Sequence, residues 1–238
     1  MPDQKLDVIG VGNAIVDVLA KAGDAFLTTH DIPKGGMILI DEPRAHRIYA
    51  EMAAAVEISG GSAANSIACI ASLGGQGGFI GKVSDDELGE IFRHDLRAMG
   101  VEFNTAPLKD GAATGRCLIN VTPDAQRSMA TFLGAAGYVT PDDVDPEQVK
   151  RAEITFFEGY LFEQPMARDG FTRACAIAKE NGKRTALWLG PDEWLVIDET
   201  GDPAADCASS KAAPSASKAS TASVPSRSIT RAFSWPLK

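Results

Sequence analysis

The chain has 238 residues, of which 45% are hydrophobic and 23% charged, and its formal net charge is −9. These values are usual for a folded protein and exclude a wholly disordered chain, a collagen-like fibre and a disulfide-stapled miniprotein. The acidic balance argues against nucleic acid or an anionic membrane as partner, since both bind clustered Lys and Arg. No apolar run approaches the length of a membrane span, and the four cysteines form no C-x-x-C pair. We therefore expect a soluble cytoplasmic protein with reduced thiols.

Strands and helices are predicted to alternate along much of the chain. The predicted strands lie at residues 6–12, 35–41, 78–83, 154–157 and 184–187, and the predicted helices at 62–73, 85–99 and 171–181. A β-hairpin is predicted for residues 115–122 and 127–133, on either side of a Pro-Asp-Ala-Gln turn. The alternation predicts an α/β fold with a mainly parallel central sheet. The hairpin and the strand at 35–41 do not fit it, and we expect them to form a small β-sheet lid.

The glycine pair Gly10 and Gly12 follows the first predicted strand, as in dinucleotide-binding folds. That fingerprint requires a third glycine three residues after the second, where this chain has Ile15. No acidic residue ends a clear second strand about 20 residues further on. An NAD-type oxidoreductase is therefore disfavoured. The chain also contains no G-x-x-x-x-G-K-[ST] loop, which excludes a P-loop nucleotide site.

Asn13 and Asp17 lie just beyond the carboxyl end of the first predicted strand. Open α/β sheets place their ligands at such ends. A carboxylate and an amide there can exchange hydrogen bonds with the hydroxyl groups of a polyol. The alternative is a turn or a helix cap, and these two residues taken alone favour that alternative.

Gly60 and Gly61 precede the predicted helix at 62–73, and Asn65 lies in its first turn. Two glycines at this position allow backbone N–H groups to approach a ligand closely. A glycine loop that serves only a tight strand-to-helix turn explains the same residues equally well. The segment is a candidate ligand-binding loop with that alternative open.

Six segments between about residues 6 and 187 match one known family in order and spacing. They are G-x-G-N-A-I-V-D-x-L (10–19), K-G-G-M-x-L-I-D (34–41), G-G-S-A-A-N-S (60–66), F-I-G-K-V-S-D-D-E-L-G (79–89), M-G-V (99–101) and A-T-G-R-C (113–117). Together they resemble the PfkB (ribokinase-like) family of carbohydrate kinases, and in particular its adenosine-kinase-like branch. The resemblance implies a ribokinase-like three-layer α/β fold, with lid strands within about residues 34–41 and 113–133.

The resemblance also implies an activity and a site. Family members transfer the γ-phosphoryl group of ATP, with Mg²⁺, to a primary hydroxyl of a small-molecule sugar or nucleoside. The positions that match the family's substrate site are Asn13, Asp17, Gly60, Gly61 and Asn65. They would hold a ribose-like moiety under the lid, which excludes water so that phosphate passes to the substrate.

The family's catalytic signature is not found in this chain. Its G-A-G-D element, whose Asp is the base, and its N-x-x-E element near the Mg²⁺–phosphate cluster belong beyond the position of Leu187. Asp202 lies in a Gly-Asp pair, but Pro203 follows it and no strand-to-helix context surrounds it. We therefore assign no catalytic residue in this chain, and expect few of its residues to bind ATP or Mg²⁺.

The composition of the chain changes after Leu187. We expect residues 1–187 to be the N-terminal portion of the kinase domain, incomplete at its C-terminal end, and residues 188–238 to be a tail outside the family. Residues 208–238 are rich in Ser and Ala and contain five Lys or Arg and no acid, which predicts disorder or, alternatively, a basic interaction tail. One hypothesis is that the reading frame is lost near Leu187, and its rival is a genuine short variant. A sheet that ended there in mid-strand would leave an unpaired edge.

Two functions follow from these observations. The first is a sugar or nucleoside kinase, adenosine-like substrates being favoured, of which this chain carries mainly the substrate-binding half and is inactive alone. The alternative is a non-catalytic nucleoside- or sugar-binding module.

Three further interpretations concern individual residues or short segments. Glu158 either faces the substrate or lies in an exposed loop, Cys117 is packed in a lid strand, and the acidic residues 85–87 favour a helix N-terminus over a Mg²⁺ site.

Overall fold

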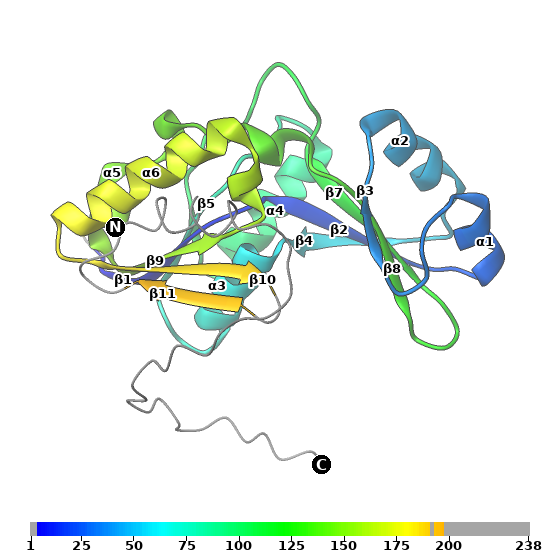
Figure 1. Ribbon diagram of the computed structural model, residues 1–238, viewed down its shortest axis with the longest axis horizontal. Coiled ribbons are helices and arrows are strands. Elements are labelled where there is room, and N and C mark those ends of the chain that lie inside the picture. The colour runs from blue at the N-terminus through cyan, green and yellow to red at the C-terminus, as the bar shows by residue number, and fades with distance from the viewer. Residues whose placement is uncertain (1–3, 191–192, 198–238) are drawn as a thin grey trace, which may run out of the picture.

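The computed structural model describes residues 4–190 and 193–197. Its elements form two lobes, each built on one β-sheet, as Figure 1 shows. The larger lobe contains a six-stranded sheet and the smaller lobe a five-stranded sheet. Within the described part of the chain, no helix is long and apolar enough to cross a membrane.

The six-stranded sheet is almost entirely parallel, as the sequence predicts. Its strand order is β11-β10-β9-β1-β5-β6, and only β11 runs antiparallel to its neighbour. The strands are β1 (Leu6–Val11), β5 (Gly77–Ile80), β6 (Glu102–Phe103), β9 (Ala152–Glu158), β10 (Arg184–Gly190) and β11 (Glu193–Ile197). The central strand β1 is buried on both faces, which explains its continuous apolar sequence.

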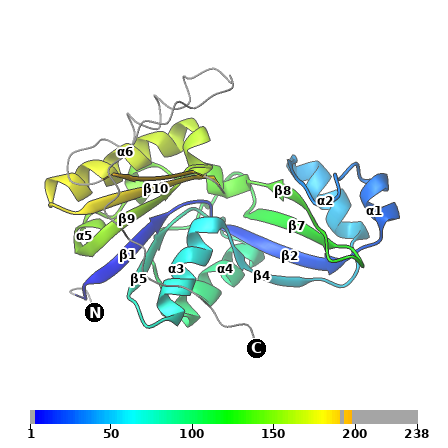
Figure 2. The same cartoon turned by 60° about the horizontal axis from the view of Figure 1, so that its bottom comes forward.

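Helices cover both faces of this sheet and make three layers (Figure 2). They are α3 (Ser62–Ser72) and α4 (Glu87–Ala98) on one face, and α5 (Pro146–Arg151) and α6 (Pro165–Glu180) on the other. Phe157 packs edge-on against Phe171 of α6 with 4.8 Å between ring centroids. Phe79 packs against Phe92 of α4 at 5.8 Å. The packing of these aromatic rings fixes the helix layers against the sheet.

The smaller lobe is the predicted β-sheet lid. Its strand order is β3-β8-β7-β2-β4. The strands are β2 (Ile15–Lys21), β3 (Met37–Leu39), β4 (Val56–Gly60), β7 (Gly115–Val121) and β8 (Arg127–Phe132), and the lobe also carries helices α1 (Asp24–Thr29) and α2 (Glu42–Glu51). The hairpin β7–β8 and strand β3 lie within residues expected to form the lid. Strands β2 and β4 complete the sheet and are not predicted from the sequence.

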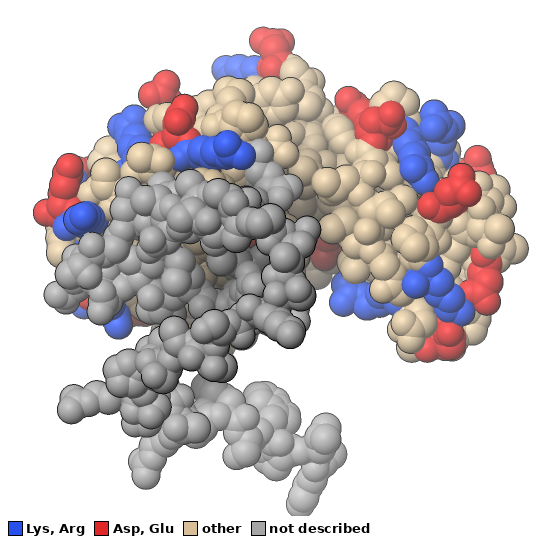
Figure 3. All heavy atoms as spheres, in the orientation of Figure 1, with Lys and Arg blue, Asp and Glu red and all other residues tan. Residues whose placement is uncertain are grey.

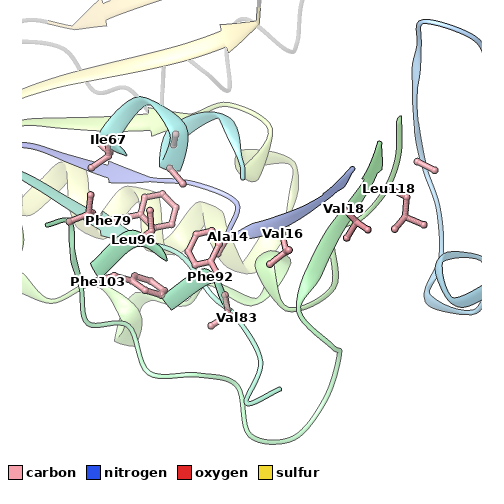
Figure 4. Packing of buried hydrophobic residues seen from close by; sticks show 14 of the residues in the cluster. Ala14, Val16, Val18, Ile67, Phe79, Val83, Phe92, Leu96, Phe103 and Leu118 are labelled. Carbon is pink, nitrogen blue, oxygen red and sulfur yellow. The ribbon is translucent and has the colours of Figure 1, made fainter. Parts of the chain in front are cut away.

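One apolar core runs from the larger lobe into the lid (Figure 4). In the larger lobe it contains fully buried Phe79 and Phe92, and strand β2 extends it with Val16 and Val18. Leu118 of β7 packs in the same cluster. Because side chains alternate along a strand, Asp17 points to the opposite face of the lid sheet.

Two observed elements differ from their predicted bounds. Helix α6 begins at Pro165, six residues before the predicted start, because proline suits the first turn of a helix and the packed Gly170 does not interrupt it. Leu187 lies inside β10, which continues to Gly190, and β11 pairs along its outer edge. The sheet therefore does not end in mid-strand at Leu187, and β11 is its outermost strand within the described residues. The predicted disordered segment 208–238 lies outside the described residues.

In the part of the chain that the structure describes, the remaining helical segments are three short 3₁₀ helices. They are η1 (Gly134–Tyr138), η2 (Pro141–Asp143) and η3 (Leu161–Glu163). The first follows β8, where the chain leaves the lid for the larger lobe.

Candidate functional site

Asn13 lies in the short segment that joins β1 of the larger lobe to β2 of the lid. It is 2% exposed, and its Nδ2 donates a hydrogen bond to Glu158 Oε1 at 2.5 Å. Its Oδ1 is also buried and finds no hydrogen-bond partner within the described part of the chain. An unpaired buried acceptor costs free energy unless a ligand or water satisfies it. Asn13 is therefore neither a turn residue nor a helix cap, and it offers an acceptor at the junction of the lobes.

Glu158 ends strand β9 and is 2% exposed. Besides accepting from Asn13, its carboxylate accepts a hydrogen bond from the backbone N–H of Ala63 at 3.1 Å, in the first turn of α3. The positive end of the helix dipole stabilises a carboxylate at that place. The structure thus excludes the exposed-loop interpretation of Glu158. The signal for it in the sequence is an acid that directly follows a buried apolar strand.

Asp17 lies in the middle of lid strand β2, not in a loop beyond β1. Burial raises the pKa of its carboxyl group, and the charge of Arg127 opposes that rise. A Cβ atom on Gly60 would lie 2.6 Å from Asp17 Oδ2, so only glycine leaves room for this carboxylate. Gly60 is therefore needed for the placement of Asp17 as well as for the turn into α3.

Gly61 adopts a φ of 94° directly before α3. A Cβ atom there would collide with the backbone oxygen of Asn13. The glycine pair thus brings the start of α3 against Asn13 on one side and Asp17 on the other. Asn65 is exposed one turn into α3, and its backbone N–H donates to Gly61 O at 2.9 Å. The structure brings Asn13, Asp17, Gly60 and Gly61 together and leaves the Asn65 side chain without a described contact to them.

The lid face that carries Asp17 is otherwise mostly apolar. Strand register places Ile58, Cys117, Thr131 and Leu39 in one row with Asp17 across the sheet. The next row contains Val56, Leu19, Ile119, Met129 and Met37. Leu39 and Val56 on the edge strands are 58% and 65% exposed, whereas Cys117 and Ile119 on the central strand β7 are buried, so this face is open only at its margins. We call these two rows the Asp17 face.

Cys117 should react slowly with a thiol reagent at pH 8, and Cys69 rapidly. Burial raises the pKa of the Cys117 thiol to about 11, against the lowering effect of the Thr131 hydrogen bond, whereas Cys69 is exposed. Because only the thiolate reacts, about one Cys117 in a thousand is reactive at pH 8, and the rate should rise as the pH approaches 11. Labelling followed by peptide mass spectrometry measures both sites. Equal labelling rates at pH 8 would contradict the burial of Cys117.

The acidic residues 85–87 serve the start of helix α4. Asp86 Oδ1 accepts from the backbone N–H of Gly89 at 2.8 Å and caps the helix. Among residues 4–190 and 193–197, no group of three or more His, Cys, Asp or Glu is arranged to hold a metal ion. Asp86 thus acts as a helix cap, and no step through Mg²⁺ is assigned to residues 85–87. Asp202 lies outside the described residues.

The profile of the pfkB family carbohydrate kinases matches residues 41–200. Fructokinase-1 of Zea mays is 29% identical over 154 residues, which cover 60% of this chain and 48% of the relative. Aminoimidazole riboside kinase of Salmonella typhimurium is 29% identical over 144 residues, which cover 56% of this chain and 44% of the relative. The chain thus spans about half the length of the curated relatives it matches.

Solved structures show the same fold. The adenosine kinase from Sinorhizobium meliloti is 49% identical with a TM-score of 0.73, over 77% of this chain and 56% of that chain. A probable sugar kinase protein from Rhizobium etli is 43% identical with a TM-score of 0.73, over the same shares. Adenosine kinase from Schistosoma mansoni in complex with adenosine, at 22% identity over 77% of this chain and 55% of that chain, has a TM-score of 0.68 and shares the fold alone. The predicted ribokinase-like three-layer fold with a β-sheet lid is confirmed.

Proposed function

Because the chain belongs to the pfkB family of carbohydrate kinases, we propose that it supplies the substrate-binding part of an ATP-dependent kinase. The kinase phosphorylates a primary hydroxyl of a sugar or nucleoside, and an adenosine-like nucleoside is the favoured substrate. ATP with Mg²⁺ supplies the transferred phosphoryl group when bound. The 238-residue chain binds and orients the acceptor and is inactive alone.

The contact between Asn13 and Glu158, beside the lid residue Asp17, is the observation that carries this proposal. Asn13 presents an unpaired buried oxygen that accepts a hydrogen bond, and Asp17 presents a carboxylate. One acceptor at the junction of the lobes and one on the lid suit the vicinal hydroxyls of a ribose, which donate one hydrogen bond each. Glu158 acts as a positioning residue, because it fixes the Asn13 amide and the start of α3 at once.

A flat apolar base explains the rest of the Asp17 face better than a simple sugar does. A sugar requires polar partners around its ring, whereas the two rows beside Asp17 are mostly aliphatic. Tyr160, two residues after Glu158, is 46% exposed and lies edge-on to Trp188 with 5.4 Å between ring centroids. Figure 3 shows mainly uncharged atoms among the described residues where the two lobes meet, with charged side chains towards either end and along the top. The 49% identity to an adenosine kinase supports the same choice.

Replacing Tyr160 with alanine should weaken adenosine binding by about five- to a hundredfold and leave ribose binding unchanged. An aromatic ring stacked on a base contributes roughly 1–3 kcal/mol by alanine substitution, and a free sugar has no base to stack. Tyr160→Phe keeps the ring and is the matched control. Isothermal titration with adenosine and with ribose measures the difference. Equal losses for both ligands would assign Tyr160 to the sugar and remove this support for a nucleoside.

The alternative, a non-catalytic nucleoside- or sugar-binding module, predicts the same binding. An assay of adenosine-dependent ADP formation by this chain tests activity directly, with fructose and ribose as parallel acceptors. We expect binding without turnover, and turnover would show that the chain itself is a kinase. Sequencing the gene across the codon for Leu187 and translating all frames separates the two functions. N-x-x-E and G-A-G-D in another frame would favour the kinase, and a sound frame without them would favour the binding module.

We also propose that the protein works in the cytoplasm. Cys69 and Cys117, in the described part of the chain, are free thiols. Free thiols are usual in a reducing compartment.

A further inference from the structure

Four chain segments connect the lid with the larger lobe, and helix α4 binds two of the lid strands where these segments meet them. Figures 1 and 2 both place α4 beside β4, near the junction of the two sheets. The two contacts are made by carboxylates at opposite ends of the helix, Asp86 and Asp95.

Asp86 holds the segment that enters lid strand β7. Its Oδ2 accepts from the backbone N–H of Thr114 at 2.8 Å, and its Oδ1 accepts from the Thr114 hydroxyl at 2.5 Å. The Thr114 hydroxyl in turn accepts from Ser84 N–H at 2.9 Å. Thr114 is fully buried, and Gly115, the first residue of β7, follows it directly. The start of β7 is therefore fixed to the N-terminus of α4.

Asp95 holds the segment that leaves lid strand β4. Its Oδ2 accepts from the backbone N–H of Ser59 at 2.9 Å, and Ser59 directly precedes Gly60. Strand β4 is the edge of the lid sheet, so this N–H has no neighbouring strand to pair with. A carboxylate that accepts from a backbone N–H makes one of the stronger kinds of hydrogen bond.

The two contacts converge on one residue of β2. Ile15 pairs with Gly115 on one side and with Gly60 on the other, so α4 holds both neighbours of β2 at the same level. Asp17 lies two residues further along β2. We propose that α4 is the positioning helix of the lid, and that Asp86 and Asp95 set the place of Asp17 relative to Asn13. The expected effect on the substrate rests on the function proposed above.

Hydrogen exchange of the full chain, resolved by peptide, tests this role without any ligand. Asp95→Ala should speed exchange in residues 56–60 about tenfold, and Asp86→Asn should do the same in residues 115–121. Exchange in residues 165–180 of α6 should be unchanged. Asp169 is an exposed acid of α6, and Asp169→Ala is the control.

Asp95→Asn should restore slow exchange, because its amide oxygen still accepts from Ser59. The side chain that Asp86→Asn introduces has only one acceptor oxygen, so it cannot replace both carboxylate oxygens of Asp86. Asp95→Ala should also weaken adenosine binding several-fold.

Each outcome decides one question. Unchanged exchange in both lid segments would overturn the positioning role of α4. Faster exchange throughout the molecule would mean that the alanine variant unfolds. The two asparagine variants would then test the positioning role, because Asp95→Asn should keep exchange slow in residues 56–60 and Asp86→Asn should speed it in residues 115–121. If the variants loosen the lid locally but the parent chain does not bind adenosine, the role of α4 is supported and the proposed function is overturned.

Discussion

Replacing Asp17 with asparagine should weaken adenosine binding by about ten- to a hundredfold. Hydrogen bonds to a charged group contribute roughly 1.5–3 kcal/mol, and every 1.4 kcal/mol corresponds to a tenfold change in affinity. The carboxylate of Asp17 is the charged acceptor that lid strand β2 places against Gly60. Asp169→Asn removes the same charge from an exposed position of α6 and is the matched control. Titration calorimetry of the parent and both variants measures the loss.

The same variant should melt at a higher temperature than the parent at pH 7. Burial raises the pKa of Asp17 above that of an unfolded carboxyl group. The ionised side chain therefore costs stability above its folded pKa, and this cost disappears as the pH falls through that pKa. Asparagine removes the cost at neutral pH, so weaker binding cannot be attributed to unfolding. Parent affinity should also fall on acidification at a higher pH than an ordinary carboxyl group would give. Binding by Asp17→Asn as tight as that of the parent would show that Asp17 does not contact the substrate.

Replacing Gly61 with alanine should destabilise the fold by about 3 kcal/mol or more and abolish binding. Its φ of 94° disfavours any side chain, and the new Cβ would collide with the backbone oxygen of Asn13. Either a shift of the α3 start or a shift of Asn13 must relieve that collision. Both shifts would separate the groups of the site.

Gly74→Ala separates the two causes of this loss. Gly74 has a φ of 91°, but a Cβ atom there would meet nothing within 4 Å. We expect it to cost only about 1–2 kcal/mol, the usual penalty for a side chain in a left-handed conformation. Denaturant unfolding of both variants gives the comparison. Equal losses of stability would mean that backbone conformation alone explains Gly61, and that close approach to Asn13 contributes nothing.

The parts of the fold that local pattern dictates are predicted well from the sequence. Strand β1 is a short β-branched run ended by glycine, and α4 begins with acids and ends before Gly100, so both follow from residues within one element. Strand β2 was missed, because Asp17 interrupts its apolar alternation and because its register depends on distant partners in β4 and β7. Helix α2 is not predicted, although Asp41 caps it and Pro43 lies in its first turn, because the apolar residues before it favour a strand.

The candidate site could be predicted only in part for the same reason. The glycine pair and Asn13 were found from their place after a strand and before a helix. The partner of Asn13 is Glu158, 145 residues away in the sequence, and no local pattern joins the two. The need for glycine at position 60 is likewise a contact with Asp17 on another strand, not a property of the turn. Residues that act through contacts between distant elements require the folded structure.

Chemical-shift mapping of the full chain with adenosine tests the central claim most directly, because it reports binding and location together. Backbone and side-chain amide signals of Asn13, Asp17, Gly60 and Gly61 should shift in a saturable manner, while those of α6 should stay in place. The Asn13 side-chain amide should move furthest, since its buried oxygen gains a partner. Shifts confined to other residues, or none at millimolar adenosine, would contradict a nucleoside site at the junction of the lid and the parallel sheet.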